Sequence, residues 1–189
     1  MALLLVDPPP QVLAVYRASL LDFGQPSGPE ARLYHLPVGT IGLAALSKGA
    51  TAADVRRSGC RILVEWGDAA GTLTSCEMTD PTLYGSAQFR NYVEGDLLQA
   101  PLGRIAEAQG LPQMAAADFE LHLLSLPAIQ AEALHLVSQS NGIDLVLPLL
   151  SEYPSLATQG VLDFPAFATI AQTIAAARQN LAISAPLSS

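Results

Sequence analysis

The strongest constraint on the fold is a pair of alternating segments separated by a short loop. Residues 60–66 and 72–78 each alternate apolar with polar side chains, and glycines bound the loop 67–71 between them. Two such segments around a glycine-containing loop of this length are typical of antiparallel strands. The sequence therefore predicts a β-hairpin over about 60–78.

The loop also predicts how the two strands of this hairpin are paired. The simplest register has three sets of partners: Val64 with Thr74, Ile62 with Cys76, and Cys60 with Met78. Alternate side chains of a strand share a face, so this register turns one apolar face toward the core. Both cysteines lie on that face, and we expect them to be free, unreactive thiols.

The last third of the chain predicts a β-α-β unit over about 118–150. Apolar and polar residues alternate over 119–123, as in a half-buried strand. Pro127 is placed to begin a helix that runs to residue 139. The continuous apolar run 143–150 is typical of a strand covered on both faces, and a helix of this size can join two parallel strands.

Spacing and capping residues predict the remaining elements. Helices are expected over 11–24, over 51–57, over 96–109 and from Asp163 onward, and a strand is expected within 32–46. Gly59 is placed to end the small helix at 51–57. The whole pattern predicts one α+β domain over residues 1–181, with a mixed sheet packed by helices, and a flexible C-terminal tail over 182–189.

The composition is apolar and acidic for a chain of 189 residues. Hydrophobic residues make up 50% of the sequence, charged residues 14%, and the net charge is −8. A shortage of charge is compatible with a homo-oligomeric interface, and equally with an alanine- and leucine-rich composition that favours helices. Nucleic acid and anionic membranes are not expected partners, because the chain has a single lysine, Lys48, and few clustered arginines.

No segment predicts a membrane anchor or an exported protein. The chain has no run of about 18 apolar residues, which is the length that spans a bilayer. Its opening apolar segment ends at Asp7 and lacks the basic residues of a signal peptide. We therefore expect a cytoplasmic protein.

Sequence motifs for catalysis or cofactor binding are missing. The nucleophile motif G-x-S-x-G and the phosphate-binding motifs G-x-G-x-x-G and G-x-x-x-x-G-K-[ST] do not occur. A pair of Cys60 with His35 is conceivable, although a buried cysteine usually acts as a small apolar residue. No cofactor is predicted, and whether the protein is an enzyme stays open.

Two groups of residues are candidates for a site. Glu132 and His135 stand three apart on the predicted helix, and Glu120 and His122 precede them on a strand, so these four are weak candidates for metal ligands. The alternative is a solvated helix face with a local Glu–His contact. The second group is aromatic and contains Tyr84, Phe89, Arg90 and Tyr92, which could line a ligand pocket, contact a partner or cover the core.

These observations favour a non-catalytic protein that works through protein contacts, including self-association. The alternative hypothesis is a small-ligand-binding protein or a hydrolase-type enzyme, with a pocket near Tyr84–Tyr92 reached by one histidine.

Overall fold

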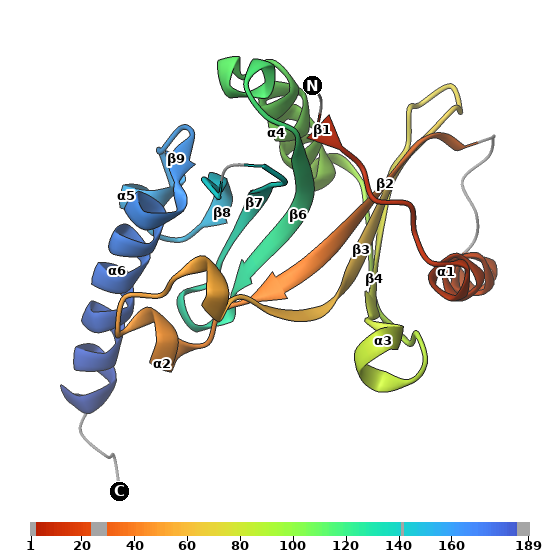
Figure 1. Ribbon diagram of the computed structural model, residues 1–189. Helices are drawn as coiled ribbons and strands as arrows, with labels where there is room; N and C mark the ends of the chain where they lie inside the picture. The colour runs from red at the N-terminus through yellow and green to blue at the C-terminus, as the bar shows by residue number, and fades with distance from the viewer. Residues whose placement is uncertain (1–2, 24–29, 141, 185–189) are drawn as a thin grey trace, which may run out of the picture.

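The fold is built on one mixed β-sheet. The computed structural model describes residues 3–23, 30–140 and 142–184. Nine strands form the sheet, in the order β5-β4-β3-β2-β6-β7-β8-β9, and β1 pairs with β6 at the side (Figure 1). The predicted α+β class with a mixed sheet and packed helices is therefore confirmed.

The bounds of the elements are as follows. The strands are β1 Leu3–Leu4, β2 Glu30–Thr40, β3 Arg56–Trp66, β4 Leu73–Thr79, β5 Phe89–Glu94, β6 Phe119–Leu126, β7 Ala131–Ser138, β8 Leu145–Ser151 and β9 Leu162–Asp163. The helices are α1 Pro10–Phe23, α2 Leu43–Leu46, α3 Pro81–Tyr84, α4 Gln99–Gln109, α5 Pro154–Ala157 and α6 Phe164–Ser184. Four 3₁₀ turns are η1 Ala52–Asp54, η2 Asp96–Leu98, η3 Pro112–Ala115 and η4 Pro127–Ile129.

The sheet consists of two antiparallel halves. Strands β2 to β5 form one half and β6 to β9 the other, and each half is followed by a long helix, α4 or α6. The halves meet through a short parallel pairing of Val38–Thr40 in β2 with Leu123–Ser125 in β6. Because so few residues pair there, the two halves of the sheet diverge on either side of this point. We call these two halves the two arms.

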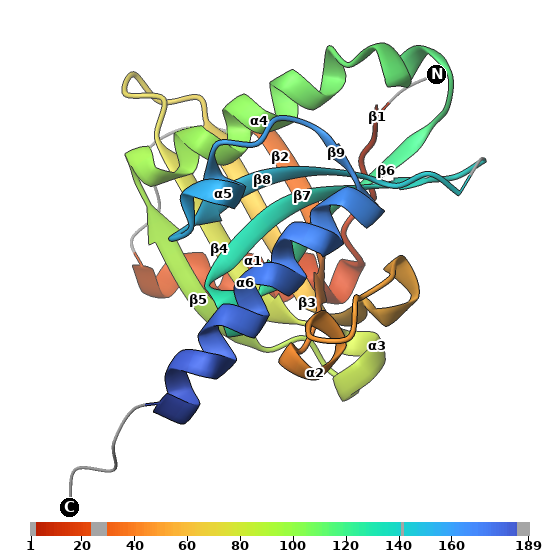
Figure 2. The same cartoon turned by 90° about the vertical axis from the view of Figure 1, so that its left-hand side faces the viewer.

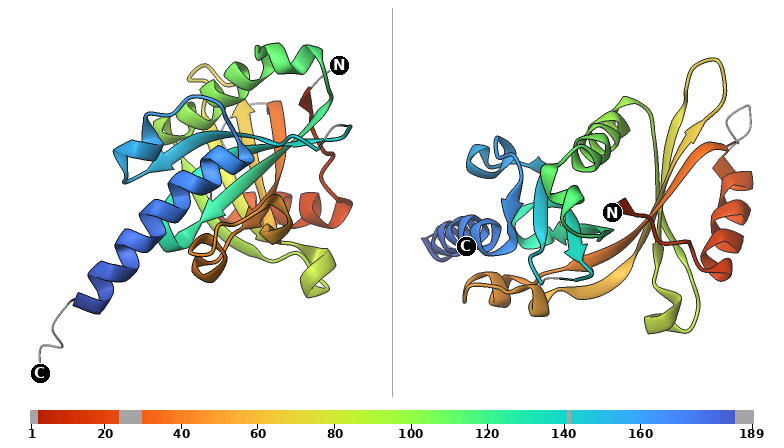
Figure 3. Two further views of the ribbon diagram at one scale, coloured as in Figure 1. Left: turned by 60° about the vertical axis from the view of Figure 1, so that its left-hand side comes forward. Right: turned by 45° about the horizontal axis from the view of Figure 1, so that its top comes forward.

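Different helices cover the two faces of the sheet. Helix α4 lies between the two arms, where its Ile105 and Ala108 pack with leucines from both halves (Figure 3). Helix α1 covers the outer side of the first half, and α6 crosses the outer side of the second (Figures 2 and 3). We call the face that carries α4 the inner face and the opposite one the outer face.

The hairpin expected over 60–78 is confirmed, with its register. Strands β3 and β4 pair Cys60 with Met78, Ile62 with Cys76 and Val64 with Thr74. The cysteines are buried and free. Burial raises the pKa of Cys60 to about 12 and that of Cys76 to about 11, so both are unreactive thiols.

The helix expected in the middle of 118–150 is wrong, although the outer strands are where the sequence placed them. Ala131–Ser138 is strand β7, antiparallel to both β6 and β8. Pro127 begins only the short turn η4, and Gln130 then reverses the chain with a left-handed backbone, φ 47°. Alanine, glutamate and leucine favour helices, but strand partners on both sides override that intrinsic preference.

The ends of the helices agree with their capping residues in part. Asp163 Oδ1 accepts a hydrogen bond from the Ala166 amide at 2.8 Å and so caps α6. The small helix expected at 51–57 is shorter, because β3 already begins at Arg56. Helix α6 extends to Ser184, inside the expected tail 182–189, and residues 185–189 lie outside the described residues. None of the described helices is both long and apolar enough to cross a membrane.

Candidate functional site: a histidine groove on the outer face

All three histidines of the chain lie on the outer face of the sheet. His35 belongs to β2, His122 to β6 and His135 to β7. Their strand neighbours, such as Leu36 and Leu121, point to the inner face and pack under α4. Three segments that are far apart in the sequence therefore place imidazole rings on the part of the outer face between α1 and α6.

Two of these rings form a pair. His122 and His135 are direct partners in the register of β6 and β7, with ring centroids 6.4 Å apart and ring planes at 76°. Each ring has a carboxylate at its Nε2 atom: Glu120 Oε1 is 3.2 Å from His122, and Asp144 Oδ2 is 2.8 Å from His135. The Nδ1 atoms are thereby the ring nitrogens that remain for another partner.

Asp144 is held firmly in its ionised form. Its other oxygen, Oδ1, accepts a hydrogen bond from the Ser138 amide at 3.1 Å. Burial by itself acts to raise the pKa of Asp144, but the hydrogen bonds from His135 and Ser138 outweigh it and lower that pKa overall. This carboxylate can therefore fix the orientation of the His135 ring through its Nε2 atom.

The pKa values of His122 and His35 are also lowered, but in a histidine this favours the uncharged form. Burial of the rings is the largest cause of both pKa shifts. His35 is sealed in the core and its Nδ1 donates to the Val6 carbonyl oxygen at 3.1 Å. His122 is less enclosed and lines a cavity. His35 is thus a structural residue, and His122 is available for chemistry.

The histidine pair opens onto a cavity of about 360 Å³. Pro37 and Gly39 of β2 also line it, and Ala52 and Val55 contribute a further part of its wall. Gly39 makes that wall possible, because a Cβ atom at this position would overlap the Val55 side chain. Arg57 also lines the cavity, and its Nε atom forms an ion pair with the buried Asp80.

A second cavity, of about 370 Å³, adjoins the first. The two share Ala52 and Asp144 in their linings. The second is more apolar and is lined by Ile143, Phe164 and Pro165 at the start of α6. The ring of Phe164 also contacts His135, with centroids 5.3 Å apart. We call the two cavities together the histidine groove.

The four weak candidates for metal ligands do not lie on one face of the sheet. Glu120, His122 and His135 share the outer face, but Glu132 lies on the inner face, where it binds Arg61. Residues three apart share a face of a helix but lie on opposite faces of a strand, so the change of β7 from helix to strand separates Glu132 from His135. Within the described ranges, no group of three or more His, Cys, Asp or Glu side chains could hold a metal ion.

The aromatic candidates are spread along the edge of the sheet. Tyr84 lies on α3 and is 56% exposed. Phe89 and Tyr92 belong to the edge strand β5 and are half-buried against the core beneath α1. Arg90 is at a bulge of the same strand and lines a cavity on the inner face. Tyr92 also donates a hydrogen bond from its hydroxyl to Glu94 at 3.0 Å.

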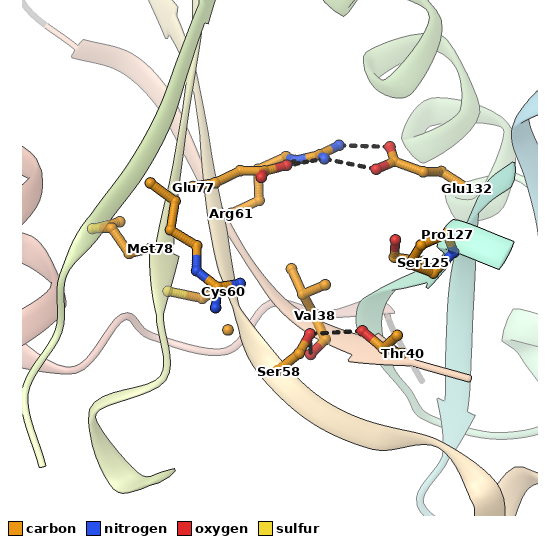
Figure 4. Close-up of a pocket in the computed structure, with 12 residues that line it drawn as sticks. Val38, Thr40, Ser58, Cys60, Arg61, Glu77, Met78, Ser125, Pro127 and Glu132 are labelled. Atoms are coloured by element: carbon orange, nitrogen blue, oxygen red, sulfur yellow. Dashed lines mark hydrogen bonds and ion pairs between the residues drawn. The ribbon is translucent and has the colours of Figure 1, made fainter. Parts of the chain in front are cut away.

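That inner cavity, of about 190 Å³, contains a bridge between the two arms (Figure 4). Arg61 of β3 makes two hydrogen bonds of 2.8 Å to Glu132 of β7 and also binds Glu77 of β4. Burial alone acts to lower the pKa of Arg61, but the two glutamates raise it overall. The charges and hydrogen-bonding groups of these three side chains are paired with one another, and the contacts join strands β3, β4 and β7. We therefore regard this network as structural.

Comparisons with protein-family models, with curated proteins and with solved structures found no match for this chain. The site therefore has to be interpreted from its own chemistry. Sequence reasoning named His122 and His135 but missed Arg57 and Asp144. The available signal was the alternation of Ala131, Ala133 and His135, which is compatible with a strand and would have placed His135 opposite His122.

Proposed function

We propose that the protein binds a small organic anion in the histidine groove. The observation that carries this proposal is the His135–Asp144 pair, which is nearly sealed from solvent and stands where two cavities adjoin. Buried ionisable pairs are costly to maintain, and at the wall of a cavity they are often functional.

The first cavity, which His122, His135 and Arg57 line, is suited to a negatively charged ligand group. Arg57 contributes a guanidinium to its lining, and an imidazolium ring in it can donate from Nδ1, the nitrogen that no carboxylate occupies. Hydrogen bonds between such cationic donors and a phosphate or carboxylate are among the strong ones in proteins. Among the residues that the structure describes, no serine, threonine or cysteine lines this cavity, and the proposed binding is noncovalent.

The second, more apolar cavity is suited to the hydrophobic part of a ligand. Phe164 and Pro165 form its wall, and Ile143 is 56% exposed beside it. A ligand that spans both cavities would cover this isoleucine and place its charged end against His122 and His135. Ligand pockets commonly combine an apolar lining with a few fixed polar groups in this way.

Filling the groove at Ala52 is the test of this proposal. Ala52 is exposed, belongs to η1 and lines both cavities, so an Ala52→Trp substitution obstructs the groove without disturbing the core. We expect phenylphosphonate, an anion with an aromatic body, to bind the unmodified protein at millimolar concentrations or below and Ala52→Trp to weaken that binding about tenfold or more. Titration followed by NMR of the histidine ring protons measures both effects.

The matched control is Ala53→Trp. Ala53 is the exposed neighbour of Ala52 in η1 and lines neither cavity, so its substitution should leave the affinity unchanged. If phenylphosphonate causes no saturable change in the His122 and His135 signals, or if both variants behave alike, the proposed function is wrong.

Self-association is a second candidate function. Large apolar side chains are exposed at both ends of the edge strand β5: Leu83 and Tyr84 at one end, and Leu97, 81% exposed, at the other. The bulge at Arg90 interrupts the open edge, which disfavours simple strand addition. A contact between two copies would therefore use these exposed side chains.

Light scattering coupled to size exclusion tests this candidate. We expect the purified protein to form a dimer or larger assembly whose population rises with concentration, and a Leu97→Lys substitution to shift it toward the monomer. Leu150→Lys, at an equally apolar exposed position on β8, is the control and should have no effect. A monomer at every concentration would contradict self-association.

A further inference from the structure

We propose that the protein hydrolyses phosphodiesters in the first cavity of the histidine groove, with His122 and His135 as the two proton-transfer groups. This inference rests on the proposed function and deepens it, because it names both the class of anion and the reaction. It is carried by the arrangement of two imidazoles that are direct partners on neighbouring strands and line one cavity. Each of them has a carboxylate close to its Nε2 atom.

The spacing of the rings suits a single tetrahedral group. Proton transfer requires a catalytic nitrogen within about 2.6–3.2 Å of the reacting oxygen. The two rings have centroids 6.4 Å apart and both line one cavity of about 360 Å³, so a single phosphoryl group bound in that cavity can contact both. One ring can then serve the attacking oxygen and the other the departing oxygen.

The surroundings of the two rings assign their roles. Burial favours the neutral form of His122, which can accept a proton from an attacking water. Asp144 Oδ2 lies 2.8 Å from His135 Nε2 and orients that ring, and we assign to His135 the transfer of a proton to the departing oxygen. Arg57 lines the same cavity and can offset the negative charge of the phosphoryl oxygens.

The proposed step balances as a hydrolysis. The water oxygen forms a bond to phosphorus while the bond from phosphorus to the ester oxygen breaks. The proton of the water moves to His122, and the proton of His135 moves to the departing alkoxide. Exchange with solvent returns both imidazoles to their starting states. Water is the nucleophile of this step, because His122 and His135 act as the proton-transfer groups and Asp144 is bound to His135 and Ser138.

Glutamine substitutions separate chemistry from folding at these positions. In His135→Gln the side-chain amide can still donate to Asp144, as Nε2 does now at 2.8 Å, but it cannot transfer a proton. His122→Gln makes the same change opposite Glu120. His35→Asn is the control, because it preserves a donor toward the Val6 carbonyl and His35 does not line the cavity.

The experiment measures release of 4-nitrophenol from bis(4-nitrophenyl) phosphate with a chelator present. We expect turnover by the unmodified protein and by His35→Asn, and a loss of about 100-fold or more in kcat for His122→Gln and for His135→Gln. Phenylphosphonate should still bind His135→Gln, although more weakly than the unmodified protein, because one polar contact is lost while Arg57 and His122 still line the cavity.

Two results would overturn the inference while leaving the proposed function intact. One is binding of phenylphosphonate by a protein that never releases 4-nitrophenol. The other is turnover that persists in both glutamine variants. If phenylphosphonate fails to bind at all, the proposed function and this inference fall together.

Discussion

Replacing Arg61 with methionine is expected to lower the free energy of unfolding by about 3 kcal/mol. The guanidinium of Arg61 binds Glu77 within the first half of the sheet and Glu132 in the second half. Methionine keeps most of the apolar length of the side chain but leaves two partly buried carboxylates without their cation. Their mutual repulsion and their lost hydrogen bonds act against the join between the two arms.

Urea unfolding followed by circular dichroism measures this effect. The triple variant Arg61→Met, Glu77→Gln, Glu132→Gln should recover a large part of the loss, because it removes the uncompensated charges together with the arginine. Arg104→Met is the matched control. It breaks an exposed ion pair with Glu107 on α4 and should change stability by less than about 1 kcal/mol. An equal effect of Arg61→Met and Arg104→Met would contradict the assigned role of the network.

Gly59→Ala is expected to destabilise the protein by about 3 kcal/mol. Gly59 lies in β3, opposite Thr79 of β4, where a Cβ atom would overlap the backbone carbonyl oxygen of Met78. Neither strand can move away easily, since β3 also pairs with β2 and β4 with β5. The clash therefore has to be relieved by breaking the pairing at this end of the hairpin.

Gly103→Ala provides the control for this substitution. Gly103 is inside α4, and an added Cβ atom meets no neighbour within 4 Å. Alanine is intrinsically better than glycine in a helix, so this variant should gain up to about 1 kcal/mol. Both values come from the same urea unfolding series. If Gly59→Ala unfolds at the urea concentration of the unmodified protein, the close approach of β3 to Met78 is wrong.

The hairpin and the histidine groove differ in how far the sequence could predict them. The pairing of β3 with β4 is local, because a short loop joins the strands and their alternation sets the register. The groove needs β2, β6 and β7 together with η1, and those segments are far apart in the chain. Sequence reasoning could name His122 and His135, but it could not bring Arg57 or Asp144 to them.

Strand β7 is the clearest case of tertiary structure overriding a local preference. Its residues have good helix propensity, and Pro127 is a common first residue of a helix. Both faces of β7 are covered, one by the core under α4 and the other by the core under α6. Ala133, Leu134, His135 and Leu136 are therefore all buried, and no polar face marks the segment as a strand. The error had a direct consequence for function, because it placed Glu132 and His135 on one face.

The sequence by itself determined the class of the fold, the hairpin with its register, the buried free cysteines, the first helix to within one residue and the helix after Asp163. Each of these depends on interactions between residues close in the chain, where alternation, capping and turn chemistry act. Only the tertiary structure decided that β2 and β6 pair in parallel, that Arg61 bridges the two arms, and that His122 and His135 face one cavity. Those arrangements depend on contacts between distant segments, whose stability comes from burying shared apolar faces and leaves no pattern within any one segment.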